Sequence, residues 1–331
     1  MTATASVAAS SQSRIEFRGL EDTMNRRQFI ISSTASAFAI GLGAKAQASG
    51  YGGQAAPPAA PPVTRFEELR RGVGMFIGTG GTIGYLVNAD GAIAVDSQFM
   101  NTAELCVAGL KTRAPKGIEL LINTHHHGDH TGGNKAFRPL VKSIVCQENC
   151  LVWHKKVSEQ ANNVADQAFA DLSFGGSWST NFGDEKVWAR YFGAGHTSGD
   201  AVIHFEKANV VHGGDLLFRR VHPRIDGPAG ASAVNWIKVL ERIARDHSND
   251  TIFVFGHGAD NSVRGTKADV TFFRDYLSAG VDHVRKGIGA RKSKDEITKV
   301  AALPKFESVT AFNPRLTLEG TLGSIYDELS K

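Results

Sequence analysis

The feature that most constrains this chain is a dense run of metal-binding side chains within residues 120–134, LLINTHHHGDHTGGN. The apolar residues 120–122 predict a buried strand that ends at Asn123. Four histidines and one aspartate follow within six residues, 125–130. His125 and His127 are two residues apart, so they point the same way in an extended chain. Imidazole and carboxylate groups at a strand end favour Zn²⁺ or a similar divalent ion.

Three later motifs repeat this arrangement of a metal-binding side chain beside glycine. They are Gly195–Thr197, Gly213–Asp215 and Phe255–Gly258, which contribute His196, Asp215 and His257. Each lies next to an apolar, strand-like run, and glycine adopts backbone angles that other residues avoid. The repetition argues against a chance histidine run in a solvated loop.

The complete series is H-x-H-x-D-H, then a lone histidine, a lone aspartate and a last histidine. In that order it resembles the metallo-β-lactamase superfamily of binuclear metallohydrolases, over roughly residues 70–260. The resemblance implies an α/β fold, the αββα four-layer sandwich, with the site at one edge. The ligands it implies are His125, His127 and His196 for a first ion, Asp129, His130 and His257 for a second, and Asp215 as the bridge between them.

The resemblance also implies two Zn²⁺ per chain and hydrolytic chemistry. Positions left open for water are typical of catalytic rather than structural zinc sites. A water that bridges two zinc ions becomes a hydroxide nucleophile near neutral pH. Asp129 is then the candidate to orient that water or to accept its proton.

Relatives of other chemistry differ from this chain at particular positions. Redox relatives with two irons tend to carry a carboxylate where this chain has His127. Nucleic-acid-cutting relatives insert a large domain before the last histidine, and the stretch between Asp215 and His257 has no room for one. Thioesterases of the glyoxalase type follow the lone histidine with T-P-G-H, whereas residues 197–200 here are TSGD. These differences favour hydrolysis and weaken the thioesterase interpretation.

The leading hypothesis is a zinc-dependent hydrolase that acts on a small molecule. It would open a cyclic amide or ester, as a β-lactamase does. Arg219, Arg220 and Arg224 are candidates to bind a substrate carboxylate, although they also fit ordinary surface arginines. Against β-lactamase specificity, true β-lactamases usually carry Cys or Ser where this chain has Asp215. A lactonase or thioesterase of the same superfamily, a non-catalytic metal-loaded periplasmic accessory protein and a single-iron dioxygenase stay open.

The N-terminal residues resemble an export signal. Asn25–Ile30, NRRQFI, resembles a twin-arginine motif, with an apolar stretch to about Ala44 and a small-x-small cleavage site at residues 46–48. We therefore expect a signal over 1–48, with 1–23 an upstream over-extension before Met24. A Pro/Ala-rich linker follows over 49–64, and the hydrolase domain covers 65–331. This predicts a periplasmic protein without stable membrane insertion after cleavage; an uncleaved anchor is the alternative.

Charge and cysteine content exclude other classes. The net charge of +4 comes from 37 basic and 33 acidic residues, and no basic run is interleaved with aromatics, so we expect no nucleic-acid partner. The three cysteines do not form a disulfide framework. Buried thiols are favoured, and a Cys146–Cys150 pair stays open.

Local patterns predict where the secondary structure lies. Asp96 ends one predicted strand, where it either supports a histidine ligand or caps the next helix, which begins with Asn101 as N-cap. The residues expected to form a loop are 174–182. The expected strands are 73–79, 82–87, 92–95, 118–124, 143–145, 186–191, 201–205, 209–212 and 251–255, and the expected helices are 101–113, 147–172, 231–245, 264–289, 293–303 and 316–329.

Overall fold

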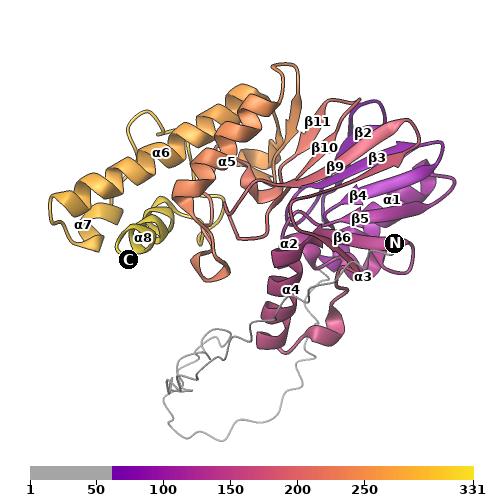
Figure 1. Cartoon of the computed structure of the whole chain (residues 1–331), viewed down its shortest axis with the longest axis horizontal. Coiled ribbons are helices and arrows are strands. Elements are labelled where there is room, and N and C mark those ends of the chain that lie inside the picture. Colours follow the sequence, from indigo (N-terminus) through magenta and orange to yellow (C-terminus); the bar gives the residue numbers. More distant parts are fainter. Residues whose placement is uncertain (1–61) are drawn as a thin grey trace, which may run out of the picture. The chain divides into compact units, whose positions relative to one another are not determined.

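The computed structural model describes residues 62–331 (Figure 1). The predicted export signal and nearly all of the predicted linker therefore lie outside the described residues. Within 62–331, no helix combines the length and the apolar character needed to cross a bilayer.

The first sheet has seven strands in the order β1-β2-β3-β4-β5-β6-β7. Neighbours from β1 to β4 are antiparallel, whereas β4 to β7 pair in parallel. The turn between β3 and β4 uses Gly91, whose φ of 128° is open to glycine but strained for other residues. The strands are β1 (Arg65–Arg70), β2 (Val73–Ile77), β3 (Ile83–Asn88), β4 (Gly91–Val95), β5 (Ile118–Ile122), β6 (Ser143–Gln147) and β7 (Leu172–Phe174).

The second sheet has six strands in the order β15-β13-β11-β10-β9-β8. Its members are β8 (Ser177–Phe182), β9 (Glu185–Tyr191), β10 (Ala201–Phe205), β11 (Val210–His212), β13 (Ile252–Val254) and β15 (Arg264–Gly265). Strands β10 and β11, both expected from the sequence, pair antiparallel as a hairpin. A separate two-stranded ribbon joins β12 (Phe218–Arg219) to β14 (His257–Gly258) in parallel.

Helices cover the outer face of each sheet (Figure 1). The first sheet packs against α1 (Met100–Arg113), α3 (Asn134–Phe137) and α4 (Glu148–Gln160), and the short α2 (Gly128–Thr131) follows β5. The second sheet packs against α5 (Ala233–Asp246) and α6 (Lys267–Gly289). Two further helices, α7 (Lys294–Thr298) and α8 (Leu318–Leu329), contact α6. The expected αββα sandwich is confirmed.

Strand periodicity explains the sandwich. In β4, Ile93 and Val95 belong to the core between the sheets, whereas Ala92 and Ala94 pack against α1. Successive strand residues point to opposite faces, so a strand buried on both faces must be apolar throughout.

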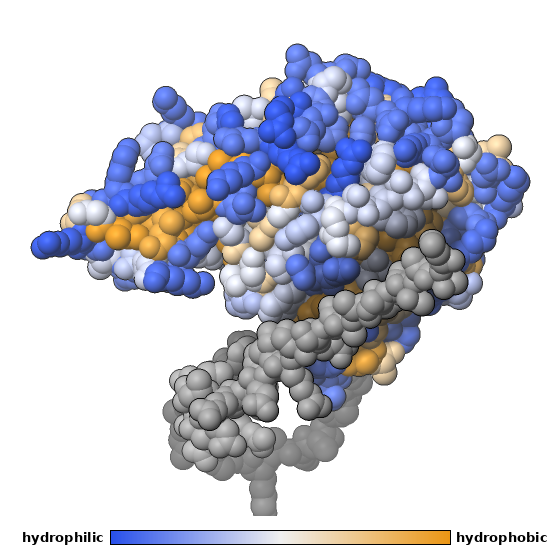
Figure 2. Space-filling model, viewed as in Figure 1, coloured by the Kyte–Doolittle hydropathy of each residue, from blue (hydrophilic) through white to orange (hydrophobic). Residues whose placement is uncertain are grey.

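Hydrophilic residues cover much of the upper edge in Figure 2, and hydrophobic ones show between them in the region of α6.

Five sequence predictions about local structure were wrong. The helix expected from residue 264 begins at Lys267, and residues 264–265 form β15 instead. Residues 174–182 are largely strand, because alternating exposure in β8 is typical of a sheet edge. The helix expected over 147–172 ends at Gln160, and the helix expected over 293–303 ends at Thr298. Helix α1 begins one residue earlier than expected, with Phe99 rather than Asn101 at the N-cap.

Strand direction decides where the functional side chains meet. Strands β4 and β5 are parallel, so their carboxyl ends lie at the same edge of the first sheet. Strands β9, β11 and β13 also run in one direction within the second sheet. The segments that leave these strands carry every metal-binding residue that the motifs predicted.

Candidate metal centre

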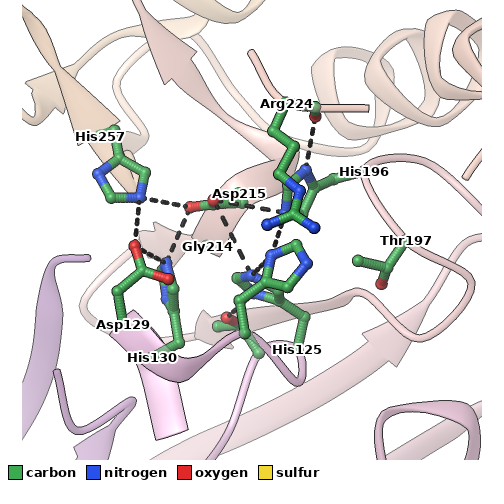
Figure 3. Close-up of polar contacts among 12 residues, drawn as sticks. His125, Asp129, His130, His196, Thr197, Gly214, Asp215, Arg224 and His257 are labelled. Carbon is green, nitrogen blue, oxygen red and sulfur yellow. Dashed lines mark hydrogen bonds and ion pairs between the residues drawn. The ribbon is translucent and has the colours of Figure 1, made fainter. Parts of the chain in front are cut away.

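The structure brings the seven predicted donor residues together at one edge of the sandwich (Figure 3). They come from four segments: the loop after β5 with α2, the β9–β10 loop, the turn after β11, and the start of β14. They divide into two groups that share one carboxylate. The first is His125, His127, His196 and Asp215, and the second is Asp129, His130 and His257.

In the first group three imidazole nitrogens face one another. Nδ1 of His127 lies 3.1 Å from Nε2 of His125 and 2.9 Å from Nε2 of His196. Oδ2 of Asp215 lies 3.4 Å from the His196 nitrogen and 3.9 Å from the His125 nitrogen. His125 and His196 are buried, and His127 is nearly so.

Hydrogen bonds on the outer side of two rings fix which nitrogen carries the proton. Nδ1 of His196 donates to the carbonyl oxygen of Arg224 at 2.8 Å, and Nε2 of His127 donates to the carboxylate of Asp226 at 2.7 Å. Carbonyl and carboxylate oxygens only accept, so the protons sit on these outer nitrogens. The inward nitrogens of both rings therefore present lone pairs.

His125 follows the same pattern through a hydroxyl. Its Nδ1 lies 3.1 Å from Oγ1 of Thr124, which donates its own proton to Asp96 at 2.7 Å and is left to accept from His125. Three lone pairs thus converge within a buried space. Such an arrangement is repulsive unless a cation lies between the nitrogens, so this donor set fits a divalent metal ion.

The second group surrounds the other oxygen of Asp215. Oδ1 lies 3.0 Å from Nε2 of His130 and 3.4 Å from Nε2 of His257. Oδ2 of Asp129 lies 3.2 Å from the same nitrogen of His257. The outer nitrogen of His130 donates to Asp96 at 2.8 Å. One carboxylate therefore places an oxygen in each group, which is the geometry of a bridging ligand.

Two buried atoms of this group lack a hydrogen-bond partner among the described residues: Nε2 of His130 and Oδ1 of Asp215. They approach each other at 3.0 Å, but not along the directions that a hydrogen bond requires. Leaving buried polar atoms unsatisfied is costly, and a metal ion bound by both would satisfy them.

The electrostatics of the protein without ions differ between the two groups. Burial lowers the pKa of His196 to about 3 and holds that of His125 well below its usual value, so both are neutral and ready to bind metal. Burial also works to lower the pKa of His257, but Asp215 and Asp129 outweigh it and raise the pKa to about 9. His130 is likewise raised well above its usual pKa, because its neighbouring carboxylates overcome burial.

Glycines allow the backbone to approach the site closely. A Cβ atom on Gly256 would collide with the carboxylate of Asp215, and one on Gly81 would collide with the ring of His130.

Two phenylalanines flank His257: Phe218 stacks on it at 5.6 Å between ring centroids, and Phe312 lies at 4.7 Å.

Of the three arginines predicted to bind substrate, only Arg224 lines the cavity beside the metal-binding residues, a cavity of about 980 Å³. Arg219 instead bonds to Ser262 at 2.6 Å, and the guanidinium of Arg220 stacks over Phe272 at 3.4 Å. Neither of these two lines the cavity: Phe218 faces it, so its strand neighbour Arg219 points to the other side, and Arg220 follows the strand with a left-handed backbone (φ 61°).

Sequence reasoning missed two residues and left a third undecided. Asp226 holds His127, and Arg315, far along the chain, lines the cavity. No motif marks either residue, since both reach the site through chain folding. Asp96, for which two roles were open, lies against His130 and Thr124, whereas α1 begins at Met100 without a side-chain cap. His126, His127 and Asp226 also lie close enough together to form a third group of possible metal ligands. Within this group, however, the ring of His127 and the carboxylate of Asp226 are 2.7 Å apart and joined by a hydrogen bond.

The three cysteines are free and buried, as favoured from the sequence. The open alternative of a Cys146–Cys150 disulfide is therefore excluded in this structure.

The sequence pattern of one family, described as the metallo-beta-lactamase superfamily, matches residues 49–257. A metallo-beta-lactamase type 2 of Elizabethkingia meningoseptica is 25% identical over 179 residues, 52% of this chain and 67% of that protein. One of Bacillus cereus is 26% identical over 176 residues, 52% of this chain and 65% of that protein. A probable metallo-hydrolase of Methanocaldococcus jannaschii is 27% identical over 184 residues, 53% and 86% of the two chains. The chain thus spans about two thirds of the length of the first two relatives.

Solved structures with the same fold are more distant in sequence. A metallo-beta-lactamase from Pontibacter korlensis matches with a TM-score of 0.55 at 16% identity, covering 65% of this chain and 99% of that one. A metallo beta lactamase from Hirschia baltica matches at 0.53 and 19% identity, covering 65% and 97%. The family pattern covers more than half of the chain, and the fold and donor series agree with it. The chain belongs to the metallo-β-lactamase superfamily of metal-dependent hydrolases.

Proposed function

We propose that this protein is a periplasmic, zinc-dependent hydrolase that opens the carbonyl of a cyclic amide or ester, in the manner of a β-lactamase. The observation that carries the proposal is the convergence of three imidazole lone pairs beside one oxygen of Asp215, with a second donor group around its other oxygen. The twin-arginine-like residues 25–30 support export to the periplasm.

Two zinc ions fit the donor set. His125, His127 and His196 would hold the first ion, Asp129, His130 and His257 the second, and Asp215 would join both. Bound there, a zinc pair supplies an acidified water as nucleophile and polarises the carbonyl under attack.

The chain itself orients water and proton transfer through Asp129. Its side chain is 29% exposed, which makes it the most exposed of the seven donors, and it lines the cavity. Neighbouring His130 and His257 charges lower the pKa of Asp129 although burial opposes them, so the carboxylate is ionised at neutral pH. Its carboxylate can accept a proton from water beside the metal ions or hold that water in line.

The cavity indicates an apolar substrate with an anionic group. Phe99, Phe218 and Phe312 supply aromatic wall, and Arg224 and Arg315 supply positive charge. A volume of about 980 Å³ is at the upper end for small-molecule sites and admits a bicyclic compound with a side chain. A carboxylate on the substrate would pair with one of these guanidinium groups.

Asp215 favours a second candidate, hydrolysis of a lactone or thioester, because true β-lactamases usually carry Cys or Ser at this position. A short stretch of 40 residues is 50% identical to the mitochondrial hydroxyacylglutathione hydrolase of Saccharomyces cerevisiae, 13% of that protein. That stretch is too small to transfer the substrate of the yeast enzyme.

A substrate panel separates these functions. The zinc-loaded mature protein is assayed with a chromogenic cephalosporin, an acyl homoserine lactone and a glutathione thioester, each with and without a chelator. We expect chelator-sensitive turnover, highest with the cephalosporin. Highest turnover of the lactone or thioester would select the second candidate. Zinc binding without turnover of any of the three would contradict hydrolysis and favour an accessory protein.

A further inference from the structure

The loop of residues 220–226 lies between β12 and the short helix Gly227–Ala229, and we call it the orienting loop. It contacts two rings of the first donor group. The carbonyl oxygen of Arg224 accepts from His196 at 2.8 Å, and the carboxylate of Asp226 accepts from His127 at 2.7 Å. The backbone N–H of Asp226 also donates to the carbonyl oxygen of His196 at 3.1 Å.

A C-terminal segment, residues 310–321, holds this loop in place. Thr310 bonds to the two residues that flank Val221 in the chain. Its N–H donates to the carbonyl oxygen of Arg220, and its carbonyl oxygen accepts from the N–H of His222, each at 3.0 Å. The hydroxyl of Thr321, in α8, donates to the carbonyl oxygen of Pro223 at 2.9 Å in a buried contact. The segment lies beyond residue 257, where the match to the family pattern ends.

The contacts therefore form a continuous path from α8 to the metal-binding atoms. Thr321 fixes the backbone on one side of Arg224, and Asp226 fixes the ring of His127 on the other. The direction of a histidine lone pair depends on the partner of the opposite ring nitrogen, so a displaced loop would turn the lone pairs of His127 and His196 away from a shared ion.

We propose that Asp226 is a positioning residue for the first metal ion, and that the C-terminal segment acts through the orienting loop to keep it in place. The proposal rests on the proposed function only in requiring that zinc binds at the three histidines. It assigns to residues outside the family-matched region a part in building the metal centre.

Asp226→Asn tests the first step. Asparagine keeps the size of the side chain and an oxygen that can accept from Ala229 in the turn, but it removes the charge that faces His127. We expect one of two zinc affinities, measured by chelator competition, to fall about tenfold while the other stays unchanged. The exchangeable Nε2 proton of His127 should also shift in the NMR spectrum. Asp282→Asn, an exposed aspartate on α6, is the charge-matched control.

Thr321→Val tests the second step, because valine keeps the volume and removes the hydroxyl that donates to Pro223. We expect a loss at the same zinc site, and Thr321→Ser should restore the affinity by restoring the donor. Thermal unfolding of each zinc-free variant separates a loss of metal orientation from a loss of fold.

Wild-type zinc affinity and an unshifted His127 proton in Asp226→Asn overturn the proposal, whatever the Thr321 variants do. Wild-type affinity in Thr321→Val overturns the role of the C-terminal segment. A protein that binds two zinc ions but hydrolyses nothing on the panel loses its proposed function and leaves this test intact, because the test is read from zinc binding.

Discussion

The carboxylate of Asp96 accepts a hydrogen bond from Nδ1 of His130 at 2.8 Å, across 34 residues of sequence. Asp96 is fully buried directly after β4, and it also accepts from the backbone N–H and the hydroxyl of Thr124. It therefore ties the loop after β5 to the end of β4 and turns Nε2 of His130 towards Asp215. A carboxylate that holds a histidine in this way raises its strength as a metal ligand.

Asp129→Asn should lower kcat/KM by about two orders of magnitude or more, because an amide cannot accept the proton of a neighbouring water. The fold should persist, since the side chain of Asp129, in the short helix α2, lines the cavity and its backbone contact to Gly81 does not involve the side chain. Steady-state kinetics and circular dichroism, with zinc content measured in parallel, check this. Wild-type turnover would remove Asp129 from the chemistry.

Zinc affinity at the second donor group should increase with pH from neutral to about pH 9, because His257 and His130 must each lose a proton to bind zinc. Without metal, burial works to lower the pKa of His257, but Asp215 and Asp129 raise it to about 9. The ring is therefore protonated at neutral pH and must lose its proton to bind zinc, so binding releases protons below pH 9. Calorimetry in two buffers of different ionisation enthalpy measures this release. Binding that releases no proton near neutral pH would contradict the assigned charge state.

Arg315→Gln should raise KM about tenfold for a substrate with a free carboxylate and have little effect on its methyl ester, because only the anion pairs with the guanidinium. Arg224→Gln should act in the same direction, although Arg224 also contacts Asp226 at 3.2 Å. Arg285→Gln on the exposed side of α6 is the control. Equal effects on acid and ester would show that Arg315 does not recognise the charge.

Replacement of Arg26 and Arg27 by lysine should block export, because twin-arginine signals depend on the arginine pair. The measurement is the fraction of protein in the periplasm of a host with an intact twin-arginine pathway. Expression of a shortened chain that starts at Met24 is the companion experiment, and this chain should be exported normally. An unchanged periplasmic yield of the lysine variant would refute the predicted route.

The parts of this molecule that the sequence predicted are those carried by local patterns. The donors of the metal centre follow apolar strands directly, and parallel strands bring their carboxyl ends to one edge. Asp226 and Arg315 could not be found this way, because each reaches the site through a loop whose position depends on distant contacts such as that of Thr321 with Pro223. Edge strand β8 was missed because three consecutive polar residues, Ser179, Thr180 and Asn181, separate its two aromatics and favour a loop as strongly as a strand.

The most direct test of the metal centre is anomalous diffraction from crystals of the mature protein, recorded on both sides of the zinc absorption edge. We predict two zinc peaks about 3.5–4 Å apart, on opposite sides of the Asp215 carboxylate. A single peak at the iron edge, or no metal between these side chains, would contradict the proposed zinc pair.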